Sequence, residues 1–314
     1  MRVLVTGAGG FVGAALIRHL RACLPACEIV GTTHSTPQTS PDPLTKYVRC
    51  DIAARGGRDI AALVERSRPD HVYHLAGLAS GAASDRETVF RVNKDGTRFV
   101  IEAVQKFVPH ARVLFASTGY VYGACDPARP AREDDPLPPP GGSGVYGDSK
   151  RAAEEWLAGQ EQPVIVARAF NHTGPEQTPL FAIPAFAAQI IQIERGAQSE
   201  LRVGNLDAAR DFLDVRDVVR AYAALMQAGQ PGIVNVCSGE AVRMRDVLDM
   251  LCAQSLVPIP VTSDLSRMRP ADIPVSVGDR SHLSALTGWQ PQVPLALTLR
   301  QTLDWWRART PHAG

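Results

Sequence analysis

Residues 2–20 read RVLVTGAGGFVGAALIRHL, in which four glycines interrupt an otherwise largely apolar stretch. The β-branched run Arg2–Thr6 is typical of a buried parallel strand, and residues 11–22 have the apolar spacing of a helix. Three of the glycines around this junction, Gly7, Gly10 and Gly13, are spaced three residues apart. Glycines there allow a tight turn and bring backbone N–H groups and a helix N-terminus close to a pyrophosphate. The pattern favours a dinucleotide site over a merely structural glycine turn.

Strand-like and helix-like segments continue to alternate after this junction. Apolar runs follow at 28–32, 47–50, 71–75, 112–116 and 163–168, with helical segments at 60–67, 88–107 and 145–158. This alternation predicts an α/β fold with a doubly wound parallel sheet of the Rossmann type.

The regular alternation weakens after Arg168, where prolines punctuate the chain, so we expect a second, smaller C-terminal lobe that binds substrate. We place a dinucleotide-binding domain at residues 1–170, with a returning segment at about 205–240. The substrate-binding lobe is then expected at 171–204 and 241–314.

Composition excludes several classes of protein. Among 314 residues, 33 Lys and Arg balance 32 Asp and Glu, which argues against a nucleic-acid partner. No apolar run approaches the ~20 residues that cross a bilayer, and glycines break the first segment too early for a signal peptide. We therefore expect a cytoplasmic protein with no membrane partner. The six cysteines are scattered, and His19, Cys23 and Cys27 lack a fourth ligand, so we expect neither a disulfide framework nor a metal.

A second chemical signal is the segment YGDSK at 146–150, which follows the segment ASTGYVYG at 116–123. Tyr146 and Lys150 are four residues apart and share a helix face. An ammonium one turn from a phenol lowers its pKa below the usual ~10, so that the phenol exchanges a proton with a carbonyl or alcohol oxygen. The alternative is a surface tyrosine and lysine without a catalytic role.

With the Gly-x-x-Gly-x-x-Gly spacing, these segments resemble the extended short-chain dehydrogenase/reductase family, in its nucleotide-sugar branch. The resemblance implies that Thr118 hydrogen-bonds the reacting oxygen and Tyr146 exchanges its proton. Lys150 would lower the tyrosine pKa and hold the nicotinamide ribose. The cofactor-binding residues that the resemblance implies are Gly7, Gly10, Phe11, Val12, Gly13, Thr33, His34, Asp51, Ile52, Leu75, Ala76, Gly77, Asn93, Tyr146, Lys150 and His172.

The choice between the two nicotinamide cofactors depends on the end of the second strand. An acid about 20 residues beyond the glycines usually binds the ribose 2′-OH of NAD. Thr33 and His34 occupy that place here, and the next acid is Asp42. Without a carboxylate there is no repulsion against a 2′-phosphate, although no arginine stands there to bind one. We expect NADP, with NAD as the alternative.

The resemblance extends along nearly the whole chain. RAFNHTGP at 168–175, GNLDAARDFLDVRD at 204–217 and RPAD at 269–272 are similar to segments of members that bind GDP-sugars. The substrate-binding residues implied are Thr118, Asn171, Arg210, Arg269 and Asp272. Arg210 would pair with the diphosphate, because a planar guanidinium donates two hydrogen bonds at once. Alternatively, Arg210 and Arg216 pair with the aspartates beside them.

The residue at position 120 bears on the reaction. Dehydratase members carry a glutamate there, whereas this chain has Tyr120, and tyrosine is a poor base at neutral pH. The resemblance therefore implies NAD(P)H-dependent reduction of the 4-keto group of a GDP-4-keto-6-deoxy-hexose. The product would be GDP-D-rhamnose or, from the other sugar face, GDP-6-deoxy-talose. The alternatives are a nucleotide-sugar 4-epimerase with tightly bound NAD, and a non-catalytic NADP-sensing protein of the same fold.

The resemblance also implies a homodimer. Its four-helix interface would be formed by segments 88–107 and 145–158 of both subunits. The apolar side chains of these segments that we expect at the interface are Val89, Val92, Phe99, Val100 and Trp156.

Overall fold

The computed structural model describes residues 1–34, 40, 42–79, 85–267 and 273–309. Its larger lobe contains a seven-stranded sheet in the order β10-β6-β5-β4-β1-β2-β3, and every neighbouring pair is parallel. The strands are β1 (Arg2–Thr6), β2 (Glu28–Thr33), β3 (Thr45–Arg49), β4 (His71–His74), β5 (Arg112–Thr118), β6 (Val164–Ala169) and β10 (Gly232–Val236). The prediction of a doubly wound parallel sheet is confirmed.

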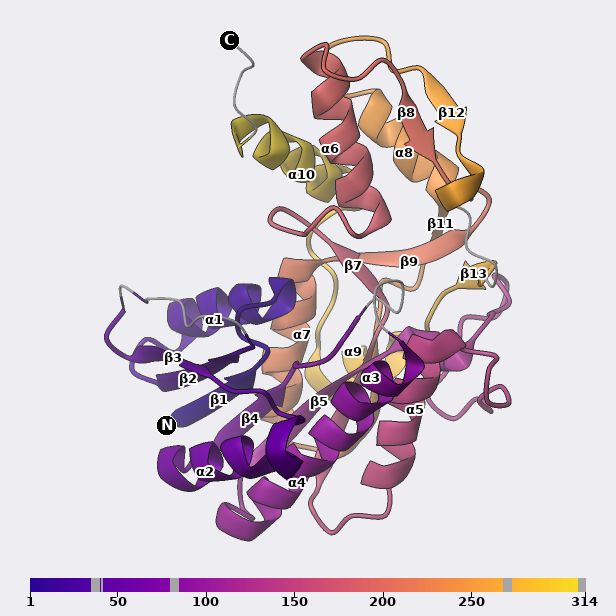
Figure 1. Ribbon diagram of the computed structural model, residues 1–314. Coiled ribbons are helices and arrows are strands. Elements are labelled where there is room, and N and C mark those ends of the chain that lie inside the picture. The colour runs from indigo at the N-terminus through magenta and orange to yellow at the C-terminus, as the bar shows by residue number, and fades with distance from the viewer. Residues whose placement is uncertain (35–39, 41, 80–84, 268–272, 310–314) are drawn as a thin grey trace.

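Helices cover both faces of this sheet (Figure 1). On one face lie α1 (Phe11–Cys23) and α7 (Val215–Ala228), and on the other lie α2 (Arg58–Ser67), α4 (Gly96–Phe107) and α5 (Gly144–Leu157). Side chains alternate along each strand, so Val3 and Val5 join the first core while Leu4 joins the second. Because both faces are covered, the strands are apolar almost throughout.

The expected single helix at 88–107 is interrupted. The chain forms α3 (Arg86–Phe90), then a π-helical turn at Arg91–Asp95, and then α4. Asn93 lies within the π turn and is fully buried. A wider turn of this kind often marks a functional site, because it re-aims one side chain without ending the helix.

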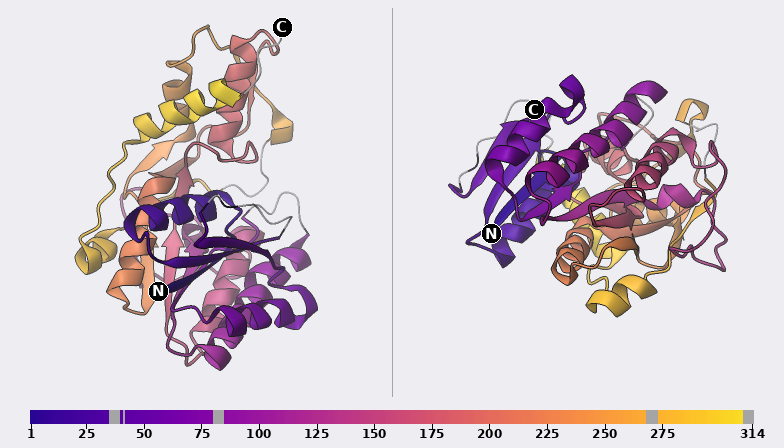
Figure 2. Two further views of the ribbon diagram at one scale, coloured as in Figure 1. Left: turned by 90° about the vertical axis from the view of Figure 1, so that its left-hand side faces the viewer. Right: turned by 90° about the horizontal axis from the view of Figure 1, so that it is seen from below.

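The second lobe is built around short strands. The strands β7 (Asn171–Thr173), β11 (Ala241–Arg243) and β13 (Val275–Ser276) all pair with β9 (Ala209–Asp214), while β8 (Leu201–Val203) pairs with β12 (Val261–Ser263). Helices α6 (Ala182–Glu194), α8 (Met244–Cys252) and α10 (Leu295–Arg309) enclose a separate apolar core. Figures 1 and 2 show this lobe lying above the carboxyl ends of the larger sheet.

The chain passes between the lobes more than once. Within the expected returning segment 205–240, α7 and β10 join the larger lobe, whereas β9 belongs to the smaller sheet. Helix α9 (Ser281–Thr287) packs against α7 and β10, and the Trp289 indole N–H donates to the Asp217 carbonyl oxygen, 3.1 Å away. Burial of Leu283 and Trp289 in the first core therefore places residues 281–289 with the larger lobe, not with the substrate-binding lobe as expected.

The described residues contain no helix long and apolar enough to cross a bilayer. The six cysteines are free thiols. In the part of the chain that the structure describes, no three His, Cys, Asp or Glu side chains gather as a metal site. His19 lies beside Cys23, and the buried Cys27 accepts a hydrogen bond from Arg21.

Candidate active site

The candidate site lies at the carboxyl ends of the central strands. Strand order reverses between β1 and β4, which are neighbours although two strands separate them in the sequence. Ligands of open α/β sheets bind in the crevice outside the strand ends at such a reversal. The glycine turn follows β1, Ala76 and Gly77 follow β4, and Thr118 ends β5, so three of the predicted segments meet there.

The glycine turn is shaped for close backbone approach. Gly7 has φ +72°, and a Cβ on it would lie 2.8 Å from the Ala76 backbone nitrogen. A Cβ on Gly13 would collide with the Gly7 carbonyl oxygen. Helix α1 begins at Phe11 with no side-chain cap at Gly10 and no acidic residue in its first turn. The backbone N–H groups in the first turn of α1 have no carbonyl partner within the helix, and they fit the pyrophosphate of a dinucleotide.

The far end of the cofactor site combines residues from β2 and from the segment after β3. Thr33 is buried and its methyl group packs close to Gly9. The His34 side chain is 85% exposed, with its Nε2 atom 3.7 Å from a carboxylate oxygen of Asp51. A carboxylate therefore stands beside His34, although it does not follow β2 directly. Ile52 is buried and packs against Gly96.

Asn93 fixes the loop that follows β4. Its Oδ1 accepts from the Leu78 N–H at 2.8 Å, and its Nδ2 donates to the Leu78 carbonyl at 3.1 Å and to Ser149 Oγ at 2.9 Å. A Cβ on Gly77 would lie 2.9 Å from Asn93 Oδ1 and 3.2 Å from Lys150 Nζ, so a larger residue would displace these two side chains. These contacts tie the π turn to the loop after β4 and to α5, so Asn93 positions that loop.

Sequence reasoning missed a buried chain of hydrogen bonds behind this loop. Thr97 donates its hydroxyl proton to the Asn93 carbonyl at 2.6 Å, so it accepts from His74 Nε2 at 3.0 Å. His74 Nδ1 then accepts from Thr6 Oγ1 at 2.7 Å, and Thr6 accepts from the Ala76 N–H at 3.1 Å. Burial lowers the pKa of His74 to about 3, so the ring is neutral. A histidine at the carboxyl end of a buried strand was the available signal.

Thr118, Tyr146 and Lys150 converge at the end of β5. Thr118 Oγ1 accepts from the Tyr120 N–H at 3.2 Å, which leaves the Thr118 proton free to donate. Tyr146 lies in the first turn of α5, where burial raises its pKa to about 12 and the Thr118 hydroxyl opposes that rise. Lys150 is buried, and its Nζ donates to the Ala116 carbonyl at 2.8 Å. Burial lowers the pKa of Lys150 to about 8, whereas nearby Glu154 raises it.

The surroundings of the two side chains set their pKa values. The Thr118 hydroxyl lowers the pKa of Tyr146, burial of the phenol outweighs this effect, and the expected lowering by Lys150 stays a prediction. The Lys150 ammonium is directed to the Ala116 carbonyl and lies 4.6 Å above the Phe115 ring. Tyr146 consequently keeps its proton at neutral pH.

Strand β7 brings Asn171 beside Tyr120 and His172 beside Phe11 at the start of α1. Asn171 Nδ2 donates to the Tyr120 hydroxyl oxygen at 3.3 Å. The His172 ring is nearly parallel to the Phe11 ring, with an interplanar angle of 8° and centroids 6.3 Å apart. His172 Nδ1 donates to the Phe170 carbonyl at 2.9 Å, and burial lowers the His172 pKa. The neutral ring therefore keeps Nε2 as an acceptor beside the glycine turn.

The two arginines of the 204–217 segment have different surroundings. Arg216 makes a two-pronged ion pair with Asp214, as the alternative interpretation expected. Arg210 is buried and donates to the carbonyls of Ala209 and Pro274, at 2.9 and 3.4 Å. The adjacent Asp211 carboxylate accepts instead from Ser238 and from the Gly239 and Gly278 N–H groups. Arg269 and Asp272 lie outside the described residues.

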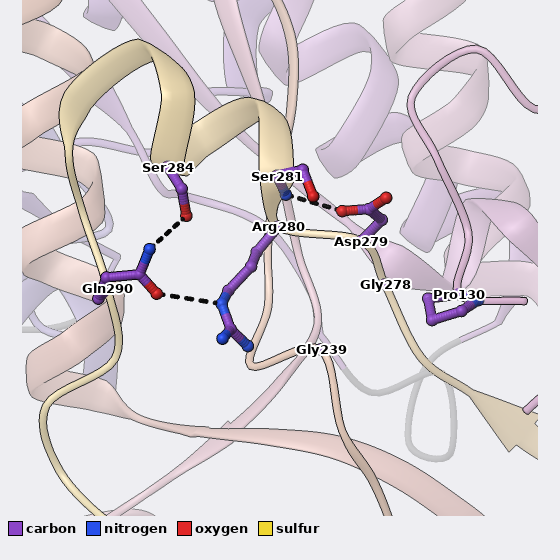
Figure 3. A pocket seen from close by; sticks show the side chains of 8 residues that line it. All are labelled: Pro130, Gly239, Gly278, Asp279, Arg280, Ser281, Ser284 and Gln290. Atoms are coloured by element: carbon purple, nitrogen blue, oxygen red, sulfur yellow. Dashed lines mark hydrogen bonds between the residues drawn. The ribbon is translucent and has the colours of Figure 1, made fainter.

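A separate polar cavity of about 570 Å³ lies beside α9 (Figure 3). Arg280 Nε donates to Gln290 Oε1 at 3.3 Å, and Gln290 Nε2 donates to Ser284 Oγ at 3.0 Å. None of the residues predicted to bind cofactor or substrate lines this cavity. The glycine turn and the Tyr146 site are therefore distinct from it.

The fold and the site define a dinucleotide-binding α/β protein with a Thr/Tyr/Lys constellation. Comparison with known proteins agrees, because the NAD dependent epimerase/dehydratase family matches residues 3–237. The chain belongs to this family, which confirms the resemblance drawn from the sequence.

Individual relatives cover almost the entire chain. It is 33% identical over 316 residues to GDP-6-deoxy-D-mannose reductase of Pseudomonas aeruginosa, covering 98% of each sequence. The structure of RMD from Pseudomonas aeruginosa complexed with NADPH has a TM-score of 0.79 at 31% identity and covers 98% and 99% of the two chains. The UDP-glucose 4-epimerase of Thermus thermophilus in complex with NAD has a TM-score of 0.86 at 28% identity, covering 99% and 100%.

Proposed function

We propose that this protein is a nicotinamide-dependent oxidoreductase that reduces the 4-keto group of a GDP-4-keto-6-deoxy-hexose. The observation that carries the proposal is the convergence of Thr118, Tyr146 and Lys150 at the end of β5, with the Thr118 hydroxyl beside the Tyr146 phenol. Reduction of a ketone needs a proton donor, whereas elimination needs a base, and the neighbouring position 120 holds tyrosine rather than a carboxylic acid. Similarity over 98% of the chain to a GDP-6-deoxy-D-mannose reductase supports the choice of substrate.

Each residue of the constellation then has a defined task. The bound dihydronicotinamide supplies the hydride that reaches C4 of the keto sugar. Tyr146 donates its phenolic proton to O4, so one hydride and one proton convert the ketone to an alcohol. Thr118 donates a hydrogen bond to the same oxygen, because the Tyr120 N–H already occupies an acceptor position on its Oγ1. Lys150, close to Gly77, would hold the nicotinamide ribose.

The expected product is GDP-D-rhamnose, or GDP-6-deoxy-talose if the hydride reaches the other sugar face. Arg210 would bind the diphosphate, together with Arg269, and Asp272 would bind ribose hydroxyls. We propose NADP as the cofactor, since β2 ends in Thr33 and His34 without an acid and one relative binds NADPH. NAD is the alternative, and a cytoplasmic location stays a prediction.

A nucleotide-sugar 4-epimerase is the second candidate. It is favoured by the TM-score of 0.86 to UDP-glucose 4-epimerase in complex with NAD. An epimerase oxidises and then reduces the same carbon, so its cofactor shows no net change. A non-catalytic NADP-sensing protein is the third candidate, and it would neither oxidise the cofactor nor convert a sugar.

We also propose a homodimer through a four-helix interface. Each subunit would contribute segment 88–107, which overlaps α3 and includes the π turn and α4, and segment 145–158, which includes all but the first residue of α5. Two of the expected interface residues must be removed from it, because Val89 and Val100 are fully buried within one subunit. Val92, Phe99 and Trp156 are partly exposed and remain in the proposed interface.

The test is to offer GDP-4-keto-6-deoxy-mannose with NADPH or NADH and follow both cofactor and sugar. We expect one cofactor oxidised per sugar consumed and a 6-deoxy-hexose product whose C4 configuration is read by NMR. GDP-mannose, which has no ketone, is the control and should leave the cofactor unchanged. Inversion at C4 of a nucleotide sugar that carries a C4 hydroxyl, such as UDP-glucose, without net change in the cofactor would indicate the epimerase. Conversion of neither kind of sugar would indicate the sensor.

A further inference from the structure

Tyr120 occupies a position from which it can contact the substrate. It lies in the 3-10 turn Gly119–Tyr122, two residues after Thr118, and its side chain is partly exposed. Its ring meets the Tyr146 ring edge-on, with centroids 6.2 Å apart and an interplanar angle of 69°. Tyr120 is therefore packed against the proposed proton donor.

The Tyr120 hydroxyl is hydrogen-bonded by the side chain of Asn171, which belongs to the smaller lobe. Asn171 Nδ2, on β7, donates to the Tyr120 oxygen at 3.3 Å, which leaves the phenolic proton available to a ligand or to solvent. The Asn171 Oδ1 atom is buried and has no hydrogen-bond partner in the described part of the chain. Unpaired buried polar groups are rare in folded proteins and need an explanation, such as a ligand. The unpaired Asn171 Oδ1 belongs to a side chain that is hydrogen-bonded to Tyr120, beside Tyr146.

We infer that Tyr120 determines substrate specificity by donating a hydrogen bond to the hydroxyl on the carbon next to the reacting carbonyl, with Asn171 as its positioning residue. The inference rests on the proposed function, which places the reacting oxygen at Tyr146. Two phenols in edge-to-face contact can reach oxygens on adjacent carbons. In a 4-keto-6-deoxy-hexose, C5 carries the methyl group and the ring oxygen, so the vicinal hydroxyl is the one on C3.

A cycle of variants and substrates tests this contact. The substrates are GDP-4-keto-6-deoxy-mannose and its 3-deoxy analogue, and the variant is Tyr120→Phe, which keeps the ring against Tyr146. For the 3-hydroxy substrate we expect kcat/KM to fall about 3- to 10-fold, the worth of one neutral hydrogen bond. For the 3-deoxy substrate we expect little change, so the preference of the wild-type protein for the 3-hydroxyl shrinks by the same factor.

Two further variants separate contact from packing. Tyr122→Phe removes a hydroxyl from the same turn, but that hydroxyl bonds Asn235 and Arg168 at 2.8 Å each, so the substrate preference should be unchanged. Asn171→Ala should reduce the preference in the same direction as Tyr120→Phe. The double variant should lose no more than the larger single loss, because the two residues act as one unit.

An unchanged 3-hydroxy preference in Tyr120→Phe would overturn the inference while leaving the reductase intact. If the wild-type protein reduces neither substrate, the proposed function fails, and binding then decides the inference. In that case GDP-6-deoxy-mannose and its 3-deoxy counterpart are titrated by tryptophan fluorescence. The affinity ratio should shrink in Tyr120→Phe, and an equal ratio would overturn the role of Tyr120.

Discussion

Replacing Lys150 by methionine should make the protein more stable while abolishing its activity. The Lys150 side chain is buried, and burial lowers its pKa from the usual 10.5 to about 8. Each unit of pKa corresponds to about 1.4 kcal/mol, so holding the ammonium in the folded state costs about 3 kcal/mol at pH 7. Methionine fills similar volume without a charge. It also leaves the Ala116 carbonyl without its 2.8 Å donor, which costs about 1–2 kcal/mol. We therefore expect a net gain of about 1–2 kcal/mol.

The gain should depend on pH in a defined direction. Between pH 8 and 10.5 the unfolded chain keeps the Lys150 proton while the folded protein releases it, so the wild-type protein gains stability as pH rises. The advantage of Lys150→Met should therefore be complete below pH 8 and decline toward pH 10.5. Urea denaturation at pH 7 and pH 10 measures both values. Lys106→Met, at an exposed lysine of α4, is the control and should change stability little at either pH.

A Lys150→Met protein less stable than wild type at pH 7 would refute the reasoning. The same holds if its advantage grows between pH 8 and 10.5, since the ammonium would then be a net stabilising group. The expected combination of higher stability and lost turnover is the trade-off common at functional sites.

Other changes address separate parts of the site. Tyr146→Phe should lower the reduction rate by about 10²–10⁴ with the fold retained, as steady-state kinetics and circular dichroism would show, because the proton donor is removed. Arg210→Ala should raise KM for the nucleotide sugar more than it lowers kcat, if the diphosphate contact is equal in ground and transition states. His34→Asp should shift the preference from NADPH toward NADH by at least about tenfold in kcat/KM, because a carboxylate repels a 2′-phosphate. Light scattering at micromolar concentration should give the mass of a dimer, and a monomer would exclude the four-helix interface.

The fold could be predicted from local sequence because each signal was strong and short. The Arg2–Thr6 run, the glycine turn and the helix after it follow one another without interruption, and their geometry depends on backbone conformation alone. The π turn at Arg91–Asp95 could not be predicted in this way. It is linked to contacts of Asn93 with Leu78 and Ser149, which are distant in sequence.

The chemistry of the site was harder to predict than its location. Spacing placed Tyr146 and Lys150 on one helix face, but the pKa of each depends on burial, which spacing does not report. The His74 chain and the Tyr120–Asn171 contact each join segments from different strands. Local spacing does not predict contacts between residues that are far apart in the sequence, even where both residues can form hydrogen bonds.

The most direct test of the central claim is to follow the hydride itself. NADPH deuterated at the transferable position of C4 of the nicotinamide is incubated with GDP-4-keto-6-deoxy-mannose and the protein, and the sugar is examined by NMR. The account predicts one deuterium atom at C4 of the product for each cofactor oxidised by the wild-type protein. When the Tyr146→Phe protein replaces the wild type, no deuterated product should form on the same timescale. A sugar product that carries no deuterium at C4, formed without net oxidation of the cofactor, would contradict it.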